Sequence, residues 1–195
     1  GAVGEEVAQR GEGEQRERAR HAQPLQAREA ARAHAARRGL DLAREQGWAP
    51  LLKVGNWIGP VLVAAAEAGV RDLLLLGYHG KLIKLAGGIF HTHHHLADGR
   101  LEVLVALGLD VGLPHAALRQ LRSAASVEDA FQGLAAGEAQ LLGQHLAATV
   151  EQRSQDYVAR YGDWPLRISA ALFDRGRVIR WRGPVAEERF FTLMD

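Results

Sequence analysis

One stretch, residues 73–100, limits what this chain can fold into more than any other. It reads LLLLGYHGKLIKLAGGIFHTHHHLADGR: four leucines, a segment bracketed by glycines, a short helix pattern with two lysines, a Gly-Gly break and a histidine cluster. The run from Asp72 to Leu76 is almost continuously apolar, as in a strand buried on both faces of a parallel sheet. A glycine turn and a helix pattern follow it, so the stretch predicts a strand that feeds a helix.

The same order of elements is expected just upstream. Pro50 introduces a short strand candidate, 51–54, and the turn 55–59 follows it. Pro60 suits the start of a helix that ends at Gly69. Strand, turn and helix in repetition are typical of an α/β layered domain.

Downstream, the pattern is mainly helical. We expect helices from 101 to near 108, over 114–121, from a cap near Ser126, and over 137–160. Strands over 168–173 and 178–181 are predicted to form a C-terminal β-hairpin. The domain is expected to span 38–183, including a short helix over 39–44, with 184–195 as a tail.

Composition excludes several classes of protein. The 195 residues are 47% hydrophobic and 24% charged, as in a soluble globular protein with room for one domain and an appendage. A net charge of +1 gives no overall attraction to nucleic acid or acidic membranes. Cysteine is absent, which removes disulfides and thiol nucleophiles, and no apolar run could span a bilayer. We therefore expect a cytoplasmic protein.

Residues 1–37 are expected to be a poorly ordered leader. Their first part alternates Gly, Glu, Arg and Gln and has few large apolar side chains. Such a segment cannot bury enough surface to offset its chain entropy.

Two glycine turns, 55–59 and 77–81, follow predicted strands and open predicted helices. In open α/β sheets ligands collect at the carboxyl ends of strands, and amides at a helix N-terminus favour anionic oxygen. Lys81 and Lys84 would share one helix face, which suits a clamp for a multiply carboxylated ligand. The simpler interpretations are plain tight turns and a solvated lysine face. Neither turn is a nucleotide P-loop, because Leu82 stands where the metal-binding hydroxyl would be.

The five residues from His91 to His95 contain four histidines, which suggests a metal site. If the segment is extended, its odd-numbered histidines point to one side; if it is helical, His91, His95 and Asp98 do. Imidazoles with a carboxylate suit zinc or iron, as in a metal-dependent hydrolase. No clear second carboxylate is near, so we favour a polar loop whose imidazoles meet a ligand.

The motifs in 55–59, 77–90 and 91–93, with Ala97-Asp98, closely resemble the cobalt-precorrin-5B C(1)-methyltransferase family, CbiD, over roughly 38–183. His94 and His95 before Leu96 resemble its cyanobacterial branch. The resemblance implies S-adenosylmethionine-dependent methylation at ring carbon C-1 of a cobalt-containing tetrapyrrole in anaerobic cobalamin biosynthesis. It also implies a Rossmann-like domain with a short, mostly parallel sheet. Cobalt would be carried by the substrate, so no protein-bound metal is expected.

The resemblance also marks pocket residues. Those expected to act in catalysis are His79, His91, His93 and Asp98; those expected to bind substrate are Asn56, Gly77, Gly80, Lys81, Lys84 and Thr92. We expect the lysines to bind peripheral carboxylates of the macrocycle. One of the histidines would orient the ring or meet the cobalt axially.

The family has a further domain before this one, which the first 37 residues do not resemble. We therefore expect a fragment of the methyltransferase behind a non-homologous leader. The alternatives are a non-catalytic corrinoid-binding remnant and a metal-dependent hydrolase. The expected partner is the cobalt-precorrin substrate, without nucleic acid or membrane, and a homo-oligomer is left open.

Overall fold

The computed structural model describes residues 41, 43–45, 47–48, 50–93 and 98–192. The chain divides into two units, 1–49 and 50–195, and the second contains the sheet and the predicted site residues. In the first unit, Asp41 and residues 43–45 are helical, which agrees with the helix expected over 39–44. The predicted leader lies outside the described residues.

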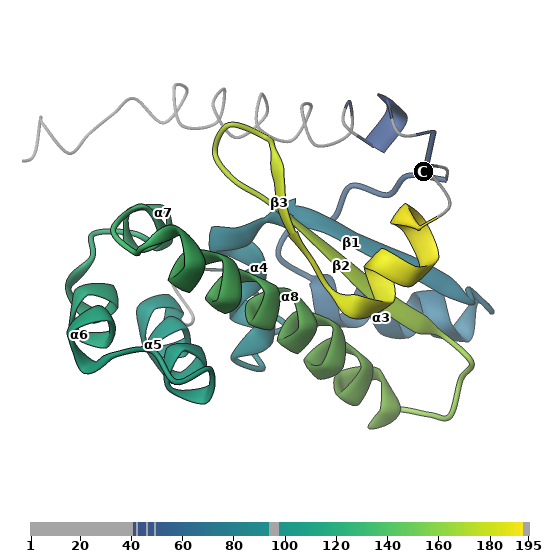
Figure 1. The fold of residues 1–195 in the computed structure, drawn as a ribbon. Helices are drawn as coiled ribbons and strands as arrows, with labels where there is room; N and C mark the ends of the chain where they lie inside the picture. The colour runs from purple at the N-terminus through teal and green to yellow at the C-terminus, as the bar shows by residue number, and fades with distance from the viewer. Residues whose placement is uncertain (1–40, 42, 46, 49, 94–97, 193–195) are drawn as a thin grey trace, which may run out of the picture. The chain divides into compact units, whose positions relative to one another are not determined.

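The second unit alternates helices with a small sheet (Figure 1). Its elements are α3 (Ile58–Glu67), β1 (Asp72–Tyr78), α4 (His79–Ala86), α5 (Arg100–Asp110), α6 (His115–Ser123), α7 (Val127–Gln132), α8 (Ala136–Ala159), β2 (Arg167–Phe173), β3 (Ile179–Arg182), α9 (Pro184–Ala186) and the π-helical turn η1 (Glu187–Phe191). No helix in the described part of the chain is both long and apolar enough to cross a membrane.

The sheet has the order β1-β2-β3. β1 runs parallel to β2, with Asp72 opposite Arg167 and Tyr78 opposite Phe173, and β3 returns antiparallel to β2. The long helix α8 packs against β2, β3 and α4 (Figure 1). The α/β class and the C-terminal hairpin are thus confirmed, while the described sheet is mixed rather than mostly parallel. The Rossmann-like assignment stays a prediction.

The four leucines of β1 are only partly buried, although the sequence predicted a strand covered on both faces. The reason is the strand order, since β1 lies at the edge of the described sheet. β2 lies in the centre and is buried from Ile168 to Phe173. The core therefore centres on β2 and on buried leucines of α4 and α8, among them Leu82, Leu142 and Leu146.

Two local predictions near β1 were wrong. Residues 51–54 form no strand, and Leu52 is 74% exposed, so this short apolar run lacks the burial that stabilises a strand. No turn separates β1 from α4, because Tyr78 ends the strand and His79 begins the helix. Gly77 belongs to the strand, where the Leu82 side chain occupies the space that a Cβ would need.

The described part of the segment expected to be a tail, 184–192, contains α9 and η1. Its first turn is held by Glu151 of α8, and Arg189 forms an ion pair with Asp72 at the start of β1 (3.0 Å). These partners lie far away in the sequence, which is why the local pattern did not predict the packing. The predicted end of α5 near Gly108 was also early; the helix continues to Asp110.

Candidate functional site

The candidate site is built on two short segments that pair with each other. Trp57 and His91 form an isolated antiparallel bridge. Beside it, the Thr92 amide donates to the Asn56 carbonyl (2.9 Å), and the Thr92 hydroxyl donates to the Asn56 side-chain oxygen (3.3 Å). The segment before α3 and the segment after α4 are thereby fixed side by side.

Both lysines of α4 contact these segments, and they share one helix face, as their spacing predicted. The Lys81 ammonium donates to the Gly55 carbonyl (2.6 Å), and the Lys84 ammonium donates to the Thr92 carbonyl (3.3 Å). Lys84 is buried, whereas Lys81 is partly exposed. Lys84 therefore ties α4 to the paired segments, and Lys81 is the one that a ligand can reach.

Burial lowers the pKa of both lysines. For Lys84 the Asp98 carboxylate acts in the opposite direction and favours the charged ammonium. Asp98 itself forms a two-pronged ion pair with Arg100 (2.5 and 2.8 Å), which lowers the pKa of the carboxyl. Asp98 does not cap α5, since Gly99 holds the cap position without a side-chain bond.

Of the histidine cluster, His91 and His93 are described and half-buried. The His91 and Trp57 rings meet edge-on, with centroids 4.5 Å apart. His94 and His95 lie outside the described residues. Within the described ranges, no group of three or more His, Cys, Asp or Glu side chains could hold a metal ion.

His79 contacts a different set of partners. Its ring is buried, and Nε2 lies 3.1 Å from Oε2 of Glu128 on α7. The rings of Phe131 and Trp181 pack edge-on against it, with centroids at 5.4 and 5.5 Å. The structure therefore places His79 against α7 and β3, with partners other than those that join Asn56 to Thr92.

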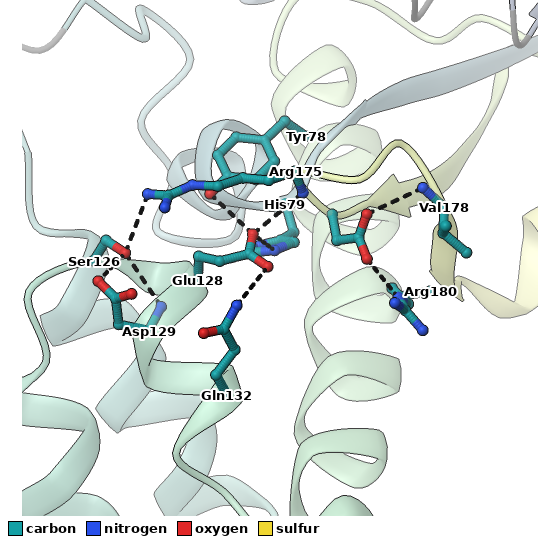
Figure 2. Close-up of polar contacts among 10 residues, drawn as sticks. Tyr78, His79, Ser126, Glu128, Asp129, Gln132, Arg175, Val178 and Arg180 are labelled. Atoms are coloured by element: carbon teal, nitrogen blue, oxygen red, sulfur yellow. Dashed lines mark hydrogen bonds and ion pairs between the residues drawn. The ribbon is translucent and has the colours of Figure 1, made fainter.

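Glu128, which the sequence did not single out, is the centre of this second cluster (Figure 2). Besides His79, its carboxylate accepts hydrogen bonds from the Tyr78 hydroxyl (3.3 Å), the Arg175 amide (3.3 Å) and the Gln132 side chain (3.4 Å). One carboxylate thus joins the end of β1, the start of α4 and the turn after β2. It fixes the helix that carries both lysines.

The buried position of His79 predicts how stability depends on pH. Burial lowers the pKa of His79 and outweighs the pull of Glu128 in the opposite direction. Between this lowered pKa and the value of about 6.5 in the unfolded chain, the unfolded state binds more protons. We therefore expect the free energy of unfolding to fall as the pH drops below about 6.5.

Urea unfolding of the parent and of His79→Asn at several pH values measures this effect. The variant should show a shallower loss of stability below pH ~6.5. His115→Asn, at an exposed position of α6, is the matched control and should keep the parent slope. If stability depends on pH in His79→Asn as it does in the parent, then His79 is not the source of the loss of stability at low pH.

Comparisons with known proteins find a family model and several relatives that are similar to the C-terminal part of this chain. Residues 91–184 match the family model described as CbiD, C-terminal domain. A cobalt-precorrin-5B C(1)-methyltransferase from Parasynechococcus marenigrum (strain WH8102) is 80% identical over 157 residues, which are 80% of this chain and 44% of that protein. The protein of the same name from Synechococcus sp. (strain CC9605) is 78% identical, over 80% of this chain and 43% of its own length.

A more distant relative, the protein of the same name from Prochlorococcus marinus (strain MIT 9303), is 62% identical over 160 residues, 80% of this chain and 42% of its own length. The chain therefore spans less than half the length of the curated relatives it matches. No solved structure matches it at a significant level.

Proposed function

We propose that the chain is the substrate-binding part of a methyltransferase, because residues 91–184 match the CbiD C-terminal family model and most of the chain is similar to a cobalt-precorrin-5B C(1)-methyltransferase. The enzyme would transfer a methyl group from S-adenosylmethionine to ring carbon C-1 of cobalt-precorrin-5B in anaerobic cobalamin biosynthesis. The relatives named above bear the name of this reaction. A cytoplasmic location also stays a proposal.

The observation that carries the proposal is the convergence of Asn56, Lys81 and Thr92 on one pair of segments. An ammonium group has three donors, so Lys81 keeps donors beyond its bond to Gly55. A partly exposed ammonium beside amide and hydroxyl groups is suited to the carboxylates at the rim of a tetrapyrrole. His91 lies in the same segments, where an imidazole could orient the ring.

Catalysis of this reaction depends mainly on how the methyl donor and the ring carbon are positioned relative to each other. S-adenosylmethionine supplies an electrophilic methyl group: the new C–C bond forms with the electron pair of the ring carbon while the S–CH₃ bond breaks and its electrons stay on sulfur. Holding two reactants in line can lower a barrier by several kcal/mol, on the order of 7–11 in favourable cases. In this proposal Lys81 and Asn56 hold the macrocycle, and Glu128 acts indirectly by fixing α4.

A direct test mixes the purified chain with methyl-labelled S-adenosylmethionine and cobalt-precorrin-5B and follows the label. The full-length Parasynechococcus marenigrum relative serves as the positive control. Label transfer by the chain supports the proposal in full. Corrinoid binding without transfer would support the binding role and leave methylation to the longer protein, whereas failure to bind would contradict both. No observation on the described residues favours the hydrolase alternative.

The role of Lys81 gives a more specific prediction. We expect Lys81→Ala to weaken binding of a carboxylated corrinoid about tenfold, because it removes one charge-assisted hydrogen bond. The dissociation constant for cobyrinic acid, whose peripheral groups are carboxylates, measures this by titration calorimetry. Arg119→Ala, which removes an exposed cation from α6, is the control and should bind as the parent does. Unchanged affinity in Lys81→Ala would show that the clamp hypothesis is wrong.

A further inference from the structure

Trp57 exposes 63% of its surface although its backbone is firmly held. It pairs with His91 in the antiparallel bridge, and its carbonyl accepts the Val61 amide (3.3 Å) in the first turn of α3. A large apolar side chain that is both fixed and exposed leaves much surface to be covered by a partner. Exposure here is not a sign of a loose segment.

The side chain of Trp57 is restrained as well. The His91 ring meets it nearly at right angles (80°), with centroids 4.5 Å apart. This edge contact limits rotation of the indole and still leaves most of the ring uncovered. The site therefore offers an oriented aromatic surface at low entropic cost, because an indole has few rotatable bonds.

The neighbours of Trp57 indicate what could cover it. Gly55 and Asn56 directly precede Trp57, and consecutive Cα atoms lie about 3.8 Å apart. The Gly55 carbonyl accepts a hydrogen bond from the Lys81 ammonium. An aromatic surface two residues along the chain from the carbonyl that an ammonium group contacts suits a flat, conjugated ring that carries carboxylates at its edge. S-adenosylmethionine suits it less well, because its sulfonium would be repelled by the same ammonium.

We propose that Trp57 is a binding residue of this site, with its indole against the face of a conjugated polycarboxylate macrocycle while Lys81 meets a carboxylate at the rim. The identification of that macrocycle as a corrinoid rests on the proposed function. The chemistry of the surface does not, since it follows from Trp57, His91 and Lys81 themselves. Trp57 lies within the 55–59 motif but is absent from the residues that the sequence analysis expected to bind substrate or act in catalysis.

Titration of the full chain with cobyrinic acid tests the proposal. Trp57→Ala should bind about tenfold more weakly, as expected for the loss of one aromatic stacking contact, and Trp57→Phe should lose less. Leu109→Ala is the matched control, because Leu109 is a similarly exposed apolar side chain (61%) on α5. Its affinity should equal that of the parent.

A second measurement uses the unmodified chain and so does not depend on how the variants fold. Hydroxyl-radical footprinting should show that cobyrinic acid protects Trp57 and leaves Leu109 as reactive as before. Parent-like affinity in Trp57→Ala, or protection of Trp57 by S-adenosylmethionine instead, would overturn the inference and leave the proposed function standing. If the parent chain binds no cobyrinic acid, the proposed function fails first and this inference fails with it.

Discussion

Replacing Glu151 with alanine is expected to lower the free energy of unfolding by about 3 kcal/mol or more. The Glu151 carboxylate is buried within α8 and accepts three backbone hydrogen bonds, from Ala170 (3.0 Å), Val185 (3.0 Å) and Ala186 (2.8 Å). Alanine would leave these N–H groups without their acceptor, and each buried unsatisfied donor costs about 1–3 kcal/mol. The first turn after β3 should loosen together with the central strand.

Urea unfolding at neutral pH measures the change, and Glu151→Gln sharpens it. In the parent, the Ala170 and Ala186 amides both donate to Oε1 of Glu151. The side-chain oxygen of glutamine can still accept both of these hydrogen bonds. The substitution also removes a carboxylate whose pKa burial raises, so its loss of stability should be clearly smaller. Arg153→Ala, on the exposed side of the same helix, should be nearly neutral. Equal losses in the alanine and glutamine variants would contradict this role of the carboxylate.

Gly143→Ala should destabilise the domain by about 1–3 kcal/mol, although alanine normally strengthens a helix. Gly143 lies within α8, and a Cβ at this position would overlap the indole of Trp181 on β3. Trp181 cannot move freely, because it also packs on Phe131, with ring centroids 4.3 Å apart, and on His79. The clash therefore has to separate α8 from β3.

The control for this prediction lies in the same helix. At Gly137 the position that a Cβ would take has no neighbouring atom within 4 Å, so Gly137→Ala should be neutral or stabilising by up to about 1 kcal/mol. In thermal unfolding, the midpoint should therefore fall for Gly143→Ala and stay the same or rise for Gly137→Ala. A raised midpoint for both variants would show that helix propensity, and not contact with Trp181, decides the effect at Gly143.

Elements with a local signal were predicted well from the sequence. The Ser126 cap is confirmed, since its hydroxyl accepts the Asp129 amide (3.2 Å), and the helix expected over 137–160 is Ala136–Ala159. The errors depend on distant partners. The segment after Gly183 is held by Glu151, more than 30 residues earlier, and no pattern near Gly183 indicates that contact.

In the candidate site, too, the features with a local sequence signal were predicted and those that depend on distant partners were not. The shared face of Lys81 and Lys84 followed from helical spacing, and the motifs in this region predicted the likeness to CbiD that the comparisons find over residues 91–184. Glu128 could not be found, because His79 and Arg175 lie 49 and 47 residues away from it. The roles of the individual side chains in catalysis stay predictions.

The bridge between Trp57 and His91 closes a loop of the polypeptide that contains α3, β1 and α4. Closing this loop costs conformational entropy, and the cost is part of the folding of the domain rather than of ligand binding. A molecule that binds across the closure then meets groups already in place, and little of its affinity is lost to ordering the polypeptide. We therefore expect a ligand to bind this part of the protein with little change in the conformation of the backbone.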